Sequence, residues 1–171
     1  RSRRQRQMCI RDRINNRQDD AALERIINTP VRGIGDTTMD KVRENARSLQ
    51  VTLWQSLQQM LANKQLTGRA ANAISTFVQM IDQLEADSKD LSLDEQADHV
   101  IQMSGLMAMY LAEKGEKAQT RVENLNELVN ACANATYVNT EEMTPLSAFL
   151  SQAALEAVSY THLRAHETPE H

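Results

Sequence analysis

The sequence predicts an all-α protein, an irregular bundle of seven to eight helices with short connections and one helix–hairpin–helix-like element. Three observations lead to this prediction. Apolar residues recur every three or four positions through most of the chain. Helix-capping residues stand before many of these apolar stretches. The 171 residues include only five Gly, three Pro and 4% aromatic residues, which argues strongly against an all-β sandwich with its many turns and aromatic or β-branched strands.

Four helices are predicted in the first half of the chain. The residues expected to open or cap them are, in order, Asp19 and Asp20, Asp36 and Thr37, Thr52, and Thr67. Pro30 is expected to end the first helix. The apolar stripes expected to face the core are Ala22, Leu23, Ile26 and Ile27; Met39, Val42, Ala46 and Leu49; Leu53, Leu57, Met60 and Leu61; and Ala70, Ile74, Phe77, Val78, Ile81 and Leu84.

The second half adds up to four more helices. Ser92 and Glu95 form a predicted capping box. Gly105 is expected to interrupt the chain before the next helix, another helix follows Gly115, and the last begins at Thr144-Pro145, since Pro suits a first helical turn. The stripes here are Val100 and Ile101; Leu106, Met107, Tyr110 and Leu111; Val122, Leu125, Leu128, Val129 and Cys132; and Leu146, Phe149, Leu150 and Ala153.

The two ends of the chain differ in composition from the middle. Residues 1–13 carry six Arg against one Asp, whereas residues 14–157 carry twelve Lys and Arg against twenty Asp and Glu. The sequences RSRRQRQMCIRDR and VSYTHLRAHETPEH look like translated sequencing-adapter read-through, so residues 1–13 and 158–171 are expected to be non-native tails. The alternatives for residues 1–13 are a basic arm that binds phosphates and a solvated tail. The domain is then residues 14–157.

Few residues suggest catalysis. No G-x-x-x-x-G-K-[ST] phosphate loop is present, and residues 14–157 offer no Ser/His/Asp or Cys/His pair. Residues 94–98, DEQAD, resemble the acidic box that holds magnesium in ATP-driven helicases, but no apolar strand precedes them and Glu95 already serves the capping box. We therefore expect no catalytic residue, cofactor or metal in this chain. No apolar run approaches the ~20 residues of a membrane span.

One local sequence suggests binding. Residues 29–37, TPVRGIGDT, lie between two predicted helices. Gly33 and Gly35 are expected to adopt positive φ and to let a ligand approach the backbone. The amides of Gly35, Asp36 and Thr37 would face outward at a helix N-terminus, where Arg32 could add a charge-assisted contact. This pattern favours a phosphate site of the kind with which a helix–hairpin–helix holds a DNA backbone. The alternative is a tight turn whose glycines serve packing.

In four segments the chain resembles the UvrD/PcrA/Rep family of superfamily 1 DNA helicases. These segments are NNRQDDAALERIINTPVRGIGDTTMDKVRE, VTLWQSLQQML, SGLMAMYLAEKGEKAQTRVENLNELV and PLSAFLSQAALEA. They run in order through residues 14–157 and resemble the family's accessory subdomain, an α-helical insertion in the second RecA-like motor domain. The nucleotide and translocation motifs of the family are absent. Ala118 stands where the family often has Gly.

The resemblance implies a fragment of an ATP-dependent 3′–5′ DNA helicase of repair and replication, cytoplasmic and associated with the bacterial nucleoid. It implies that this subdomain binds double-stranded DNA near a fork or junction and swivels against the parent's motor domains, which would hold ATP and magnesium. The DNA contacts carried over by motif are Thr29, Arg32, Gly33, Ile34, Gly35 and Thr37. Asp19 and Asp20 are a candidate regulatory pair. The alternative is a free-standing α-helical protein-interaction module with no nucleic-acid role.

Overall fold

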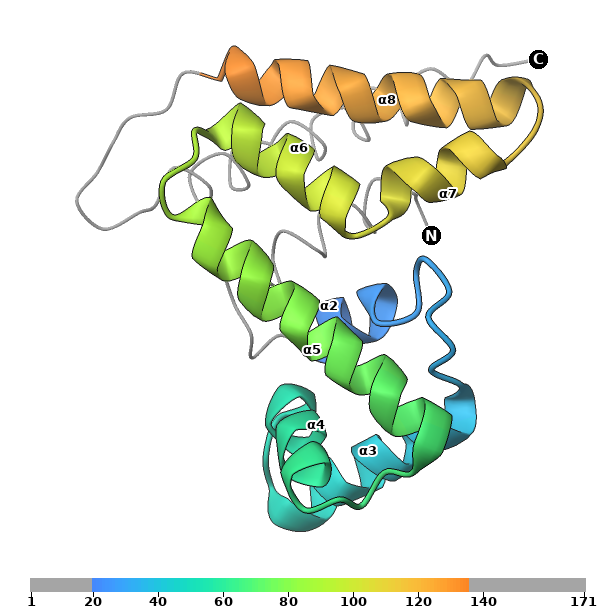
Figure 1. The fold of residues 1–171 in the computed structure, drawn as a ribbon, viewed down its shortest axis with the longest axis vertical. Coiled ribbons are helices and arrows are strands. Elements are labelled where there is room, and N and C mark those ends of the chain that lie inside the picture. Colours follow the sequence, from blue (N-terminus) through green and yellow to red (C-terminus); the bar gives the residue numbers. More distant parts are fainter. Residues whose placement is uncertain (1–19, 136–171) are drawn as a thin grey trace, which may run out of the picture.

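The computed structural model describes residues 20–135, and within that range the chain forms seven helices and no strand (Figure 1). The all-α prediction is therefore confirmed. The helices are α2 (Asp20–Ile26), α3 (Asp36–Leu49), α4 (Leu53–Ala62), α5 (Gly68–Ser88), α6 (Leu93–Met103), α7 (Leu106–Ala112) and α8 (Glu116–Ala133). The helix predicted from Thr144 lies outside the described residues.

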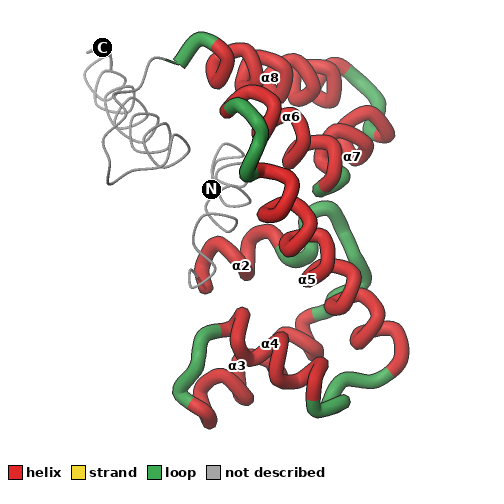
Figure 2. The backbone as a smooth tube through the Cα atoms, turned by 60° about the vertical axis from the view of Figure 1, so that its left-hand side comes forward, coloured by secondary structure: helices red, strands yellow, loops and turns green. Residues whose placement is uncertain are grey.

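Helix α5 connects two groups of helices. Figure 1 shows α3 and α4 packed near its N-terminal end, and α6, α7 and α8 beyond its C-terminal end. The tube in Figure 2 shows the same division from another side, with α2 beside the middle of α5. The loop between α2 and α3 runs along α5, so it lies close to both groups.

The main core joins α2, α3, α4 and α5. Phe77 and Leu84 of α5 are buried on the stripe that the sequence predicts. Val100 of α6 and Leu106 of α7 also belong to this core. Helices α6, α7 and α8 share two smaller clusters, one around Cys132 and one around Leu125. Cys132 therefore fills core space, as expected. Because Leu106 anchors α7 in the main core, the second group of helices is held against the first.

Thr52, Thr67 and Ser92 are the N-cap residues of α4, α5 and α6, as predicted, whereas the cap predicted for α3 is wrong. The hydroxyl of Thr52 accepts a hydrogen bond from the amide of Gln55 in a capping box, and Glu95 accepts one from the amide of Ser92. Asp36 and Thr37 do not cap α3. Gly35 is the N-cap residue and forms no side-chain cap, so the chain enters α3 one residue earlier than the cap prediction required.

Two apolar positions assigned to core stripes are instead exposed. Leu49, in the last turn of α3, is 53% exposed, and Leu111 of α7 is 66% exposed. Both helices end within a residue of these positions, so a periodic pattern that is correct for most of the helix extends past the part that packs.

Charge is divided along the molecule. Residues 20–77 contain seven Lys and Arg against five Asp and Glu, whereas residues 82–98 contain seven Asp and Glu against one Lys. The second segment covers the C-terminal end of α5 and the first half of α6, away from the loop that precedes α3 (Figure 1). The acidic character of the middle of the sequence is thus concentrated at one end of α5.

Candidate nucleic-acid interface

The loop at residues 28–36, called here the hairpin loop, connects α2 to α3 and contains most of the predicted contacts. The side chain of Asn28 accepts a hydrogen bond of 2.7 Å from the amide of Arg32 and closes the loop. Gly33 has φ +80°, the left-handed region that the sequence predicts. Gly35 has φ −81° and ψ 171°, so the positive φ expected there is wrong. Its extended backbone is the ordinary conformation of an N-cap residue.

The predicted contact residues divide by exposure into two sets. Gly33, Gly35 and Thr37 are exposed, Thr29 and Arg32 are half-buried, and Ile34 is buried in the main core. The exposed set lies at the N-terminal end of α3, where the first amides of a helix have no partner within the helix. Gly35 supplies no side-chain acceptor for them. The backbone at this end of α3 therefore faces solvent, while Ile34 anchors the loop from beneath.

The guanidinium of Arg32 points into the molecule. Nη1 donates to the carbonyl oxygens of Ile26 at 2.7 Å, Pro30 at 3.2 Å and Ile27 at 3.3 Å. Nη2 donates to the carbonyl oxygen of Ser104 at 2.8 Å. Ile26 is the last residue of α2 and Ile27 follows it, while Ser104 is the C-cap residue of α6. Carbonyls at such helix ends have no partner within the helix. Arg32 therefore satisfies backbone acceptors from two helices and from its own loop.

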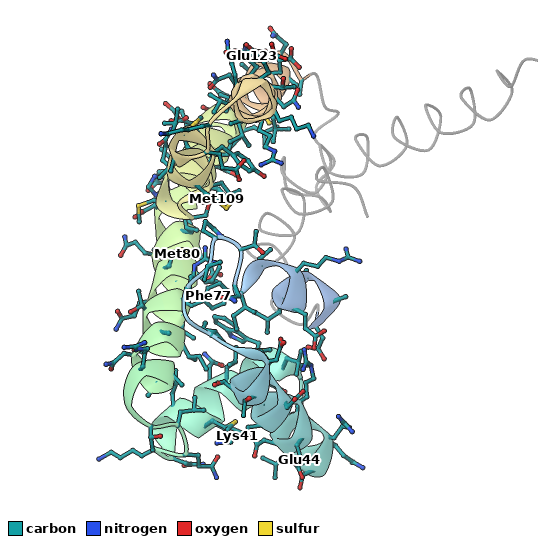
Figure 3. All side chains as sticks on the ribbon, turned by 90° about the vertical axis from the view of Figure 1, so that its right-hand side faces the viewer. Lys41, Glu44, Phe77, Met80, Met109 and Glu123 are labelled. Atoms are coloured by element: carbon teal, nitrogen blue, oxygen red, sulfur yellow. The ribbon has the colours of Figure 1, made fainter. Side chains whose placement is uncertain are left out.

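Aromatic side chains support the same guanidinium. Its central carbon lies 5.4 Å from the centroid of the Phe77 ring, which in turn meets Trp54 edge to face at 6.5 Å. Figure 3 shows Phe77 and Met80 of α5 beside the hairpin loop, and Nη2 lies 4.0 Å from the Met80 sulfur. Burial lowers the pKa of Arg32 to about 10, so the group stays protonated at neutral pH. This internal position was not predictable from the sequence, because an Arg next to a Gly in a loop between helices suggests an exposed residue.

Val31 is a residue that the sequence analysis did not single out. It is 84% exposed at the turn of the hairpin loop, next to the inward-pointing Arg32. A single exposed apolar side chain is ordinary at a protein surface, so Val31 alone does not mark a binding surface. The alternation of exposed Val31, half-buried Arg32, exposed Gly33 and buried Ile34 shows that the loop has one outer and one inner side.

Asp20 caps a helix other than its own. It is the first residue of α2, and its carboxylate accepts a hydrogen bond of 3.0 Å from the amide of Leu53, the first residue of α4. Asp20 thus caps α4, whose first residue is 33 positions away in the chain. Its negative charge also lies at the N-terminal end of α2, where the helix dipole favours an anion. Asp19 lies outside the described residues.

An open depression of about 530 Å³ lies between α2 and the adjoining ends of α3 and α4. Its lining includes Glu24, Arg43 and Arg47. Arg43 is paired with Glu24 at 2.6 Å and with Asp40 at 2.8 Å. Because acids and bases line it together, this depression has no basic character that would favour an anion.

The acidic box at residues 94–98 takes part in the start of α6. Glu95 accepts from the amide of Ser92, and Asp94 accepts from the Ser92 hydroxyl at 2.7 Å. Over residues 20–135 no group of three or more His, Cys, Asp or Glu is placed to hold a metal ion. In the same range no helix has the length and apolar character needed to cross a membrane.

Comparison with known proteins agrees with the predicted resemblance. The family profile described as UvrD-like helicase C-terminal domain matches residues 5–168. DNA helicase II of Escherichia coli (strain K12) is 54% identical over 145 residues, which are 84% of this chain and 20% of that protein. ATP-dependent DNA helicase PcrA of Bacillus subtilis is 33% identical over 144 residues, 84% of this chain and 19% of that protein.

The chain spans about a fifth of the length of the curated relatives it matches. DNA helicase II of Haemophilus influenzae, 52% identical over 145 residues, is covered to the same 20%. All of the described helices fall within the matched family profile, and so does the hairpin loop. The chain therefore belongs to the family of UvrD-like helicase C-terminal domains.

Proposed function

We propose that this chain is the duplex-DNA-binding regulatory subdomain of an ATP-dependent 3′–5′ DNA helicase that acts in DNA repair and replication. The observation that carries the proposal is the exposed N-terminal end of α3, where Gly33 and Gly35 leave the backbone open and Gly35 offers no capping side chain. Backbone amides at a helix N-terminus bind phosphate groups. Gly35 and Thr37 then contact the DNA backbone near a fork or junction.

The remaining predicted contacts enter the proposal in different roles. Gly33 gives the loop its left-handed turn, and Ile34 anchors it in the core. Thr29 and Arg32, both half-buried, hold the loop in shape, since the Arg32 guanidinium already donates to four carbonyls. Binding through amides of this kind positions the protein on a duplex without reading its sequence.

The rest of the proposal concerns the parent protein. ATP and magnesium are bound by its motor domains, against which this subdomain moves, and the chain alone is not catalytically competent. Asp19 and Asp20 bias that movement. The protein acts in the bacterial cytoplasm, at the nucleoid. Residues 1–13 and 158–171 are non-native tails, so the subdomain itself is residues 14–157.

The test is a charge placed at the N-cap of α3. Gly35→Asp gives the first turn a side-chain acceptor and should stabilise the fold by roughly a few tenths of a kcal/mol, because Asp is a somewhat better N-cap residue than Gly. The same carboxylate accepts hydrogen bonds from the free amides of α3, and its negative charge repels a phosphate group. Duplex affinity of the full-length helicase, measured on a duplex with a 3′ single-stranded tail, should therefore fall while stability rises.

Gly35→Asn is the matched control, because it caps equally well without a charge. We expect it to weaken duplex binding less than Gly35→Asp. Equal duplex affinity for wild type, Gly35→Asp and Gly35→Asn at several salt concentrations would show that this end of α3 does not touch DNA.

A further inference from the structure

The hairpin loop is attached to a distant part of the chain. The corner between α6 and α7, residues 104 and 105, lies against it. Nη2 of Arg32 donates to the Ser104 carbonyl at 2.8 Å, and Ser104 is buried. A Cβ atom added to Gly105 would lie 3.4 Å from Cγ of Pro30. The loop and the corner are thus in contact through a hydrogen bond and through close packing.

The corner itself is held by both groups of helices. Leu106, the first residue of α7, is buried in the main core with α2–α5. Met109, one turn later, packs against this core and also against the cluster formed by α6, α7 and α8. Any displacement of α6–α8 relative to α5 would therefore move the carbonyl that Arg32 binds.

We infer that Arg32 is a positioning residue that locks the hairpin loop to the α6–α7 corner, so that the arrangement of α6–α8 sets the shape of the proposed DNA-binding loop. The functional part of this inference rests on the proposed function; the coupling of loop and corner does not. Arg suits the role because its planar fork can donate to several carbonyls at once. A Lys ammonium is a compact point charge and cannot span acceptors that belong to α2, the loop and α6.

Arg32→Lys separates positioning from direct phosphate contact. If Arg32 met phosphate through its charge, Lys would preserve most of the duplex affinity and the slope of log affinity against log salt, because Lys also binds phosphate as a point charge. If Arg32 positions the loop, Arg32→Lys should weaken duplex binding of the full-length helicase about tenfold, the equivalent of ~1.4 kcal/mol. The salt slope should stay close to that of wild type.

Hydrogen exchange reports the coupling without DNA. In the 171-residue chain, Arg32→Lys should speed amide exchange both in residues 33–39 and in residues 105–109, while α8 keeps its protection. Arg47→Lys, a change at an exposed position of α3, is the matched control and should alter neither segment. Gly105→Ala perturbs the same contact from the corner, because φ +82° is strained for any residue with a Cβ atom and the added methyl group would touch the Pro30 ring.

Gly105→Ala should loosen the hairpin loop although Gly105 directly follows Ser104, which is 72 positions from Arg32 in the chain. Unchanged exchange at the loop in Gly105→Ala, or faster exchange at the loop alone in Arg32→Lys, would overturn the inference. Wild-type duplex affinity for Arg32→Lys would also overturn it. If Gly35→Asp fails to affect DNA binding, the proposed function fails, and the exchange data still decide whether loop and corner are coupled.

Discussion

Arg32 and Ser104 are 72 positions apart in the chain, yet a hydrogen bond of 2.8 Å joins the Arg32 guanidinium to the Ser104 backbone carbonyl. The bond links the loop before α3 to the end of α6. Because the same guanidinium also donates to the carbonyl of Ile26 at the end of α2, one side chain hydrogen-bonds to the C-terminal ends of two helices. The positive charge lies at the C-terminal ends of both helices, where the helix dipole favours a cation.

Removing this side chain should destabilise the fold. Arg32→Ala removes the guanidinium donor from the carbonyls of Ile27, Pro30 and Ser104, and it removes the cation above the Phe77 ring. We expect a loss of about 2–3 kcal/mol in the free energy of unfolding, the usual cost of unpaired buried acceptors. Urea denaturation of the 171-residue chain measures it. Arg47→Ala should cost less than about 0.5 kcal/mol, as exposed substitutions usually do; equal losses in the two variants would contradict the internal role of Arg32.

Asp20 should stabilise the protein through α4. Asp20→Ala removes the acceptor for the Leu53 amide and should cost about 1 kcal/mol, as the loss of a helix cap does. Asp20→Asn keeps an oxygen that can accept the same bond, so it should retain most of the stability. Thermal unfolding of the three proteins is the measurement. If the Asn and Ala variants lose the same amount, the charge of Asp20 and not its hydrogen bond is what stabilises the protein.

The two glycines of the hairpin loop should respond differently to the same change. Gly33→Ala forces a Cβ onto a residue with φ +80° and should cost about 1–2 kcal/mol. Gly35 has an ordinary extended backbone, and nothing lies within 4 Å of an added Cβ. Gly35→Ala should therefore cost less than Gly33→Ala, about 0.5 kcal/mol, because its only penalty is that Ala is a poorer N-cap residue than Gly. A large loss for Gly35→Ala would show that its conformation or surroundings differ from those described.

Acid should weaken the contact between α5 and α6. His99 Nε2 lies 2.8 Å from Asp87 Oδ2, and this hydrogen bond, followed by one from Gln83, holds the pKa of Asp87 below its usual value. A lowered carboxyl pKa in the folded state gives stability that is present above the unfolded pKa and is lost as the pH falls through the folded one. The stability difference between wild type and Asp87→Asn should thus shrink as the pH falls below about 4. Chemical denaturation from pH 6 to pH 2.5 tests this, and a difference independent of pH would contradict it.

Helix positions were predictable because local rules and packing agree over most of the chain. Thr52 and Ser92 open helices as their capping boxes require, and Phe77 is buried on the expected stripe. The rules fail at helix ends. Leu49 continues the α3 pattern but is exposed at the last position of the helix, and no periodic pattern records where packing against other helices stops.

The loop was predictable as a feature, while the directions of its side chains were not. Two glycines between helices indicate an open turn, and Gly33 has the expected positive φ. The inward position of Arg32 depends on carbonyls of Ile26 and Ser104. One of these lies 72 residues away, so its proximity is a result of the tertiary fold and leaves no mark in the local sequence.

The division of charge along α5 gives the two ends of the molecule separate electrostatic surroundings. A helix of 21 residues is about 31 Å long at 1.5 Å per residue. Electrostatic interactions in physiological salt decay over about 8 Å. The acidic segment at residues 82–98 is therefore screened from the neighbourhood of α3, and the potential that a polyanion meets there is set by local groups such as Lys41 and Arg47. Net charge, which is −4 for the whole chain, is a poor guide to what either end attracts.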